Sequence, residues 1–513
     1  MNKHETKPQA ASPVDHQPDF QKVLLSVCLA VMAVIASVSG LNVAQPMLAL
    51  EFGVPQNTVL WIINIYALTL AAFLLPLGAL GDRLGRKKML VGGLIVFGAA
   101  SFLSAVSASA KIMLIARLLT GIGAASIMPV TLAVITSTFP EQQRSKAVGI
   151  WTGVAGAGGI LGMYLSALLV DIASWRWLFL LPIVLATVSI AMTLRFVPNS
   201  TVRAQYRFDY VGSLLSVLAS VGVVYSLHEA PALGWDEPIV LASLIIAIIA
   251  MAGFIVWELG QPEPLLDIRF FRERSLSSGT ISLLTIFGVQ AGIFVVLFPF
   301  FQGVLGWSGL RSTLAMMPMA LSMMASSWLA PKVAYKIGRK YTMAIGVAMG
   351  AIGATLMGQL VSVDGGYLPI LPGLLVMGLG MGFSMTPSTE AITSSLPAER
   401  QGVASAINDV TRELGTALGV ALLGPLVTAR YSLAVGVRLK GFPKEVVAAA
   451  KEGLPHAQVI APTTGARADL LVRAAQESFV TAWQQAIWVG VVIMVLLLIY
   501  ILLFGPKRLN AHT

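Results

Sequence analysis

Five ionisable residues of this chain lie inside long apolar runs, where water cannot solvate a charge. They are Arg117, Glu390, Asp409, Arg412 and Glu413. A charge in hydrocarbon costs at least about 2.5 kcal/mol, so each of these residues is a candidate for a functional role. A buried carboxylate can bind and release a proton near neutral pH, because burial disfavours its charged form. The pattern therefore favours proton binding inside a membrane.

The three carboxylates differ in their neighbours along the chain. Glu390 follows Pro387 among apolar and hydroxyl residues, without a charged neighbour, so we expect it to be the first proton site. Asp409 and Glu413 share one helical face, and Arg412 can neutralise Asp409, which leaves Glu413 as the second candidate. The competing interpretation gives Asp409 and Arg412 a structural ion pair near the cytoplasmic mouth, and gives Glu390 a hydrogen bond without titration.

A second group of residues is of the kinds that line a pocket for amphipathic molecules. Trp61 and Asn64 are three residues apart on one predicted helix, and Asn42 can face them from the preceding one. Phe294 and Phe298 share one face of a later helix. These five residues are predicted to contact substrate. The alternatives are a place for Trp61 in the aromatic belt at the membrane surface, and simple packing for the phenylalanines.

Composition excludes a soluble protein. The chain of 513 residues is 56% hydrophobic and only 11% charged, whereas about a quarter of the residues in globular proteins are charged. The single cysteine, Cys28, permits no internal disulfide, and the five histidines show no metal-ligand spacing. We therefore expect no catalytic centre, no metal and no cofactor. The net charge of +10 lies in loops between apolar segments, so nucleic acid is not an expected partner.

The elements that must position these residues are transmembrane helices. Apolar segments long enough to cross a bilayer recur along almost the whole chain, which predicts an all-α polytopic membrane protein with fourteen spans. The predicted spans are 23–48, 59–80, 89–109, 112–138, 147–170, 177–197, 210–228, 238–258, 278–300, 311–334, 342–361, 369–395, 402–429 and 482–504.

The distribution of lysine and arginine predicts the orientation. About two thirds of them lie in the N-terminal tail and in alternate loops, while the opposite short loops hold only Lys111, Arg176 and Arg311. Both termini are therefore predicted to be cytoplasmic. The polar segment 1–22 lacks the apolar core of a signal peptide, so we expect a disordered cytoplasmic tail.

An internal repeat divides the chain. The segment 84–88 is echoed by 337–340, and 140–144 is echoed by 397–400, at closely similar offsets. Parallel half-repeats of this kind are typical of transporters that rock about a central site. The predicted division is 1–22 tail, 23–197 first six-helix bundle, 198–258 linker and two inserted helices, 259–429 first five helices of the second bundle, 430–481 outer loop, and 482–513 last helix with a cytoplasmic tail. The loop 430–481 could form a helical or hairpin cap or remain unstructured.

A glycine-rich and basic loop closes the second predicted span. Its glycines permit close packing and a sharp turn, and its acid can accept hydrogen bonds from a helix N-terminus or from an arginine. The residues predicted to act as a conformational switch are Gly78, Asp82, Arg83, Gly85 and Arg86.

This loop resembles the signature loop of the major facilitator superfamily. The segments 117–125 and 175–177 are similar to further elements of that family, while 60–66, 264–267 and 408–415 resemble its fourteen-helix drug:proton antiporter branch. The resemblance implies a fold of two six-helix bundles plus two inserted helices. It also implies proton-coupled export of drugs, dyes, antibiotics, biocides or metabolites, with a proton-relay or substrate-facing role for Arg117.

The chain departs from the pattern of that branch at three positions. Ser37 stands where the branch carries an acid, Asn64 where members that export cations often carry aspartate, and Met163 where a proline is usual. A ladder of glycines predicted to pack against neighbouring helices persists nearby, at Gly149, Gly153, Gly158 and Gly162.

Three functions follow from these observations. The first is a proton-coupled exporter of amphipathic small molecules in the bacterial inner membrane. It would use the proton gradient, reside in the lipid bilayer and work as a monomer, and an additional periplasmic adaptor protein is an open alternative. The second, suggested by Ser37, Asn64 and Arg117, is a dedicated exporter of one neutral or anionic metabolite. A membrane sensor is a remote third, since it would need an effector domain that the sequence lacks.

Overall fold

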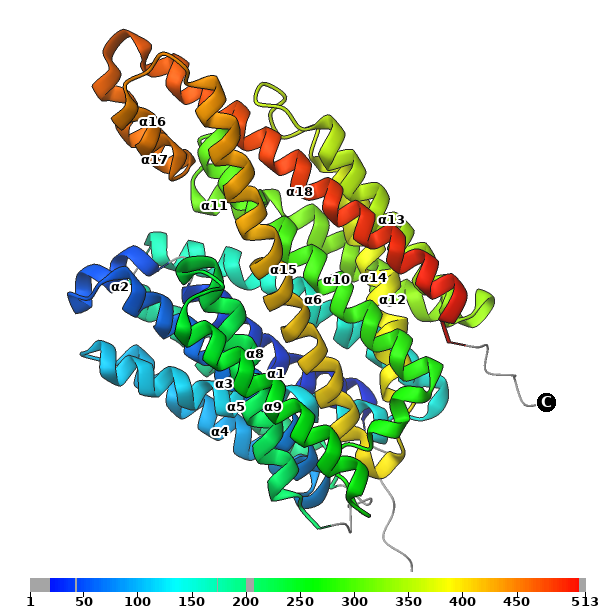
Figure 1. The fold of residues 1–513 in the computed structure, drawn as a ribbon. Coiled ribbons are helices and arrows are strands. Elements are labelled where there is room, and N and C mark those ends of the chain that lie inside the picture. The colour runs from blue at the N-terminus through cyan, green and yellow to red at the C-terminus, as the bar shows by residue number, and fades with distance from the viewer. Residues whose placement is uncertain (1–18, 42–43, 173, 200–206, 507–513) are drawn as a thin grey trace, which may run out of the picture.

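The computed structural model describes residues 19–41, 44–172, 174–199 and 207–506. Within these residues the chain consists of helices and connecting loops, without strands (Figure 1). The predicted all-α polytopic fold is thereby confirmed. Asn42 and most of the predicted tail 1–22 lie outside the described residues, while Phe20 already begins the first helix.

The first half of the chain forms one bundle of long helices. They are α1 (Phe20–Leu41), α3 (Gln56–Leu84), α4 (Arg86–Ala105), α5 (Ala110–Thr138), α6 (Glu141–Ile172) and α7 (Leu180–Phe196), with the short α2 (Gln45–Phe52) and the 3-10 turn η1 (Trp175–Phe179). The predicted first span 23–48 is therefore not one helix, since α1 ends at Leu41. Pro46 stands in the first turn of α2, where its missing N–H leaves no hydrogen bond unmade.

Two inserted helices lie between the halves. They are α8 (Tyr210–Leu233) and α9 (Pro238–Gly260), which pack against each other. Helix α8 also contacts α3 of the first half and α15 (Gln401–Arg438) of the second. The outer face of α9 exposes Ile245, Ile249 and Val256, as a lipid-facing surface should.

The second half repeats the architecture and adds an extension. Its elements are η2 (Ile268–Arg272), α10 (Arg274–Pro299), the π-helical turn η3 (Phe300–Val304), α11 (Gly309–Ala315), α12 (Met317–Ile337), α13 (Arg339–Leu360), α14 (Leu371–Thr393), η4 (Ala398–Arg400), α15, α16 (Lys444–Lys451), α17 (Leu454–Ile460), η5 (Ala461–Arg467) and α18 (Ala468–Phe504).

Each of the fourteen predicted spans overlaps one long helix, although the first helix ends before its predicted span does. Thirteen helices of the described residues are long and apolar enough to cross a membrane. The remaining predicted span, 369–395, forms α14, whose glycine, serine and threonine residues lower its hydropathy. It packs against α10, α12 and α13, so it is shielded by protein on several sides and tolerates these small residues.

The segment 430–481, predicted as an outer loop that could be a helical cap or unstructured, is largely helical. Helices α15 and α18 are 38 and 37 residues long, about 55 Å each at 1.5 Å per residue, whereas the hydrocarbon core is about 30 Å thick. They therefore project from the membrane, and α16 and α17 lie at their far end (Figure 1). Tyr431 of α15 donates a hydrogen bond to the Ala450 carbonyl at 3.0 Å, which fastens α16 to the projecting helix.

A polar corner fastens α2 to the first bundle. The Glu51 carboxylate accepts hydrogen bonds from Trp175 Nε1 at 2.9 Å and from Arg176 Nη1 at 2.7 Å. These bonds, that of Trp175 first, lower the pKa of Glu51 below its ordinary value. The motif around Trp175 thus holds a surface helix in place.

This corner makes stability depend on pH in a defined direction. A carboxylate whose pKa is lower in the folded state stabilises that state above its unfolded pKa of about 4.3, and the contribution disappears as pH falls through the folded pKa. We expect the thermal unfolding temperature of the purified protein to fall less on acidification in Glu51→Gln than in the parent. Equal pH profiles in the two proteins would contradict this.

Candidate functional site

The two halves meet through glycine contacts at two helix crossings. A Cβ at Gly78 of α3 would lie 2.6 Å from the Gly402 carbonyl oxygen of α15, and one at Gly149 of α6 would lie 2.6 Å from the Ser327 carbonyl oxygen of α12. Such distances are shorter than any side chain tolerates, so only glycine permits these contacts. Gly153 also faces Ser327: a Cβ at Gly153 would lie 3.3 Å from the Cβ of Ser327.

The two other predicted packing glycines serve the first half. A Cβ at Gly158 would lie 3.1 Å from the sulfur of Met32 in α1. Gly162 is buried in α6. The predicted packing glycines of α6 therefore have two kinds of neighbour: Gly149 and Gly153 contact the second half, and Gly158 contacts α1.

Asp82 ties the first half to the second. Its side chain accepts hydrogen bonds from Arg86 Nη2 at 3.0 Å, and from the backbone N–H groups of Gly402 and Val403 at 2.7 and 3.2 Å. The first N–H groups of a helix lack partners within it, so a carboxylate at this place completes the start of α15. Asp82 thus has both kinds of partner that the sequence analysis offered it.

Arg86 adds a second connection. Its Nη2 donates to the Ala398 carbonyl at 2.7 Å while the guanidinium stays paired with Asp82, and both side chains are buried. Arg83, predicted in the same switch, is exposed. The tie between the halves at this end of the bundle consequently rests on Asp82 and Arg86.

The second half repeats the turn at Gly85, but the arginine that follows the repeated turn has different partners. Gly85 and Gly338 both have positive φ, 102° and 91°, and each joins one helix directly to the next. Arg339 follows Gly338 as Arg86 follows Gly85. Its Nε lies 3.4 Å from Glu390 Oε2, and its Nη1 donates to Ser394 Oγ at 3.0 Å.

Glu390 is therefore not the isolated acid that the sequence suggested. Besides Arg339, Ser145 near the start of α6 lies close to its carboxylate. Glu390 has no charged neighbour along the chain, as noted from the sequence, and both of these residues come from distant segments that the fold brings to α14. Glu390 links the second half to the first at the same end of the molecule as Asp82.

The two carboxylates of α15, Asp409 and Glu413, lie further along this helix than the contact with Asp82 at its start. Asp409 Oδ1 is 3.7 Å from Arg412 Nη1 and accepts a hydrogen bond from Asn408 Nδ2 at 3.1 Å, so the predicted ion pair is present. The Arg412 guanidinium lies over the ring of Phe287 in α10, at 4.7 Å, and that of Trp151 in α6, at 5.8 Å. This cation therefore touches both halves of the molecule.

Arg117 lies in the first half and is fully buried. Its Nη1 donates to Ser37 Oγ at 2.9 Å, and its guanidinium lies 4.4 Å from the ring centre of Tyr66. Glu413 of α15 is within electrostatic range of the same tyrosine. Tyr66 is thus close to Arg117 of the first half and within electrostatic range of Glu413 of the second half.

The structure separates the residues predicted to contact substrate. Trp61 packs on Tyr225 of the inserted helix α8, with 5.6 Å between ring centres, and Asn64 is half-buried in α3. Phe294 and Phe298 pack against the core of the second half. Their substrate contacts stay predictions, and the contact of Trp61 with α8 could not be read from spacing along α3.

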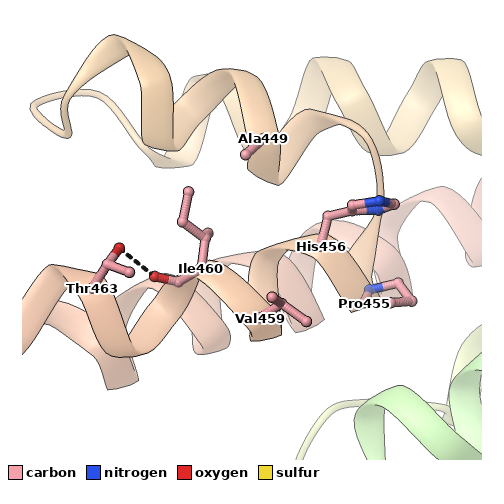
Figure 2. A pocket seen from close by; sticks show the side chains of 6 residues that line it. All are labelled: Ala449, Pro455, His456, Val459, Ile460 and Thr463. Carbon is pink, nitrogen blue, oxygen red and sulfur yellow. Dashed lines mark hydrogen bonds between the residues drawn. The ribbon is translucent and has the colours of Figure 1, made fainter.

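A hollow of about 390 Å³ lies in the outer cap, away from these residues. Figure 2 shows Ala449 of α16 opposite His456 and Ile460 of α17. His456 also lies 3.6 Å from Glu452. The remaining lining residues are Pro455, Val459 and Thr463.

Comparisons with known proteins place these observations in a family. A family model described as Major Facilitator Superfamily matches residues 27–420. The multidrug efflux pump LfrA of Mycolicibacterium smegmatis is 31% identical over 89% of this chain and 90% of its own length. The methyl viologen resistance protein SmvA of Salmonella typhimurium is 28% identical over 90% and 93%.

Solved structures agree on the fold. The proton:xylose symporter XylE superposes with a TM-score of 0.59 at 17% identity, covering 95% of this chain and 96% of its own. The human organic anion transporter MFSD10 superposes with a TM-score of 0.58 at 16% identity, over 93% and 100%. At this level of identity the likeness concerns the fold alone.

Proposed function

Because the chain belongs to the major facilitator superfamily, we propose that it is a proton-coupled exporter of amphipathic small molecules that works by alternating access. Relatives that match most of the chain are named for multidrug efflux and for resistance to methyl viologen. Antibiotics, dyes and biocides are the corresponding substrate class. No cofactor is needed, since the proton gradient supplies the energy.

The observation that carries this proposal is the joint between the halves. At the end that holds Asp82 and Glu390, the two bundles are connected by hydrogen bonds and an ion-paired loop, and Gly78 of α3 closely approaches the backbone of Gly402 in α15. Polar contacts of this kind can break and re-form when one rigid bundle rotates against the other. The described conformation is therefore closed at this end.

Proton coupling is assigned to the carboxylates at and near this joint. A proton on Glu390 would remove the charge that holds Arg339 and weaken the link to Ser145, so binding of a proton would favour an open joint. Asp409 and Glu413, on either side of Arg412, provide a second group whose charge balance depends on the position of α15. Arg117 belongs to the proposed proton-coupling group through its fixed positive charge, without exchanging a proton itself.

The orientation follows from the positive residues. With both termini in the cytoplasm, the joint at Asp82 is the cytoplasmic mouth, and the cap around α16 and α17 stands outside the bacterial inner membrane. We propose that the protein transports as a monomer. The cap is then the part that a periplasmic adaptor could reach.

A second function is favoured by one observation. Arg117 meets the hydroxyl of Ser37, where a carboxylate would neutralise it. A central cation without an acidic partner suits a neutral or anionic substrate, so a dedicated metabolite exporter is the alternative to a broad exporter of cations.

The test uses everted membrane vesicles energised to an acidic interior. Methyl viologen, neutral antibiotics and aromatic carboxylates are added in turn, and collapse of the pH gradient is compared with that in vesicles lacking the protein. Collapse by several chemically unrelated amphipathic compounds supports the proposal. Collapse by one neutral or anionic compound alone supports the second function. Uptake of a compound that leaves the gradient intact contradicts proton coupling.

A further inference from the structure

The guanidinium of Arg117 carries a buried charge without an acidic partner among the described residues. It is fully buried, and its Nη1 donates a hydrogen bond to Ser37 Oγ. Nε and Nη2 are buried, and no residue that the structure describes accepts a hydrogen bond from either of them. Arginine remains protonated in proteins, so the charge persists in this environment.

The neighbours of Arg117 do not satisfy these two donors. Tyr66 presents the face of its ring, and its hydroxyl donates to the Val34 carbonyl at 3.3 Å. The carboxylate of Glu413, which is within electrostatic range of Tyr66, has Arg412 as its own counter-charge. The interaction with the ring is favourable, but it leaves the in-plane N–H groups free.

The two free nitrogens form one edge of the guanidinium. The N–H groups of Nε and Nη2 point the same way, and this edge makes two parallel hydrogen bonds with the two oxygens of a carboxylate. A single water satisfies such an edge less well, because it offers one oxygen. The geometry of the unsatisfied donors therefore selects a planar anion with two acceptor oxygens.

We propose that the free edge of Arg117 is a binding site for the carboxylate of an amphipathic substrate. This rests on the proposed function, since it names a substrate class for the same transporter. Ser37 determines the charge of this site: its neutral hydroxyl lies 2.9 Å from Nη1, and an aspartate there would place a negative charge beside the guanidinium and compete electrostatically with a bound carboxylate.

The position of the site fits a transporter. Arg117 lies about 10 Å along α5 from its outer end, within the thickness of the hydrocarbon core. It is closed to solvent in the described conformation. A carboxylate would consequently reach it when the bundles rotate, and the ring of Tyr66 offers an apolar wall for the rest of the molecule.

The test measures equilibrium binding to the full-length protein in lipid nanodiscs, without a proton gradient. Two probes of similar size and opposite charge are used, 1-naphthoate and 1-naphthylmethylammonium, with isothermal titration calorimetry as the readout. The parent is expected to bind naphthoate. Ser37→Asp should weaken that binding at least ten-fold and leave binding of the ammonium probe equal or stronger.

Ser37→Asn is the matched control, because it has the size of aspartate without its charge and should retain naphthoate binding. Arg117→Lys keeps the charge but loses the paired donors, so it should bind naphthoate more weakly than the parent. A parent that does not bind naphthoate overturns the proposal. So does equal naphthoate binding by Ser37→Asp and Ser37→Asn.

The outcome is independent of the vesicle assay. Binding of naphthoate together with the predicted Ser37→Asp effect supports the site even if no compound collapses the pH gradient. Collapse of the gradient by cations, combined with absent naphthoate binding, supports export and rejects the carboxylate site.

Discussion

Replacement of Asp82 by asparagine is expected to reduce transport at least ten-fold while the protein remains folded in the membrane. The carboxylate accepts two backbone N–H bonds at the start of α15 and pairs with the buried Arg86. Hydrogen bonds to charged groups contribute about 1.5–3 kcal/mol each, and about 1.4 kcal/mol is a factor of ten in an equilibrium. Asparagine retains one acceptor oxygen and no charge, so the conformation in which the joint is closed should lose population.

Two measurements check this expectation. Transport is followed by collapse of the pH gradient in everted vesicles. Opening of the joint is followed by labelling of Ala404→Cys, a buried position on α15, with a water-soluble maleimide in a Cys28→Ser background. The labelling rate should rise in Asp82→Asn.

Lys88→Gln is the control for Asp82→Asn, because it alters the charge of the same loop at an exposed side chain. It should leave both transport and labelling near the parent values. Unchanged transport and labelling in Asp82→Asn would contradict the proposal that opening and closing of this joint is part of transport.

Glu390→Gln is expected to abolish gradient-driven exchange and to leave a folded protein that still binds substrate. Glutamine can keep a hydrogen bond with Ser145 and with Arg339, so the packing at the joint should persist. It cannot exchange a proton, so the link between proton binding and rotation of the bundles is lost. The expected reduction in gradient collapse is at least ten-fold.

The matched control is Glu399→Gln, which removes an exposed carboxylate in the neighbouring loop. Substrate counterflow without a gradient separates coupling from movement, and it should continue in Glu390→Gln. Full gradient-driven activity in that variant would transfer the coupling to Asp409 and Glu413. Loss of counterflow as well would show that Glu390 is needed for movement of the bundles themselves, and would contradict its role as a proton site.

Asp82 and Glu390 differ in the number of groups that hold them. Asp82 accepts hydrogen bonds from two backbone N–H groups and from Arg86. Glu390 has one arginine at 3.4 Å and one hydroxyl. We therefore assign the steady tie between the halves to Asp82 and the titrating link to Glu390.

The sequence by itself determined the features that depend on local patterns. The fourteen helices follow from the length of each apolar segment, because a helix satisfies its own backbone in lipid. The contact of Asp409 with Arg412 follows from a spacing of three residues on one helix. The arginine partner of Asp82 could be anticipated because the loop itself contains Arg86, whereas the identity of the helix terminus, the start of α15, could not.

Other features depend on which helices meet, and spacing along the chain carries no such information. Arg339 and Ser145 reach Glu390 from separate loops, and Trp61 turns to the inserted helix α8. The helices of the cap could not be predicted with certainty from segment 430–481, because its prolines and mixed charges are equally typical of a loop. The extension of α15 and α18 beyond the membrane gives that segment the support on which to fold.

Arg117 shows both contributions in one residue. The sequence located a cation in an apolar helix and a serine where an acid is usual, and it could not say which groups would surround the guanidinium. Only the packing of α1, α3 and α5 decided that one nitrogen meets Ser37, that the face meets Tyr66, and that one edge is left without an acceptor. A hydrogen bond requires direction as well as proximity, and direction is fixed by the tertiary structure.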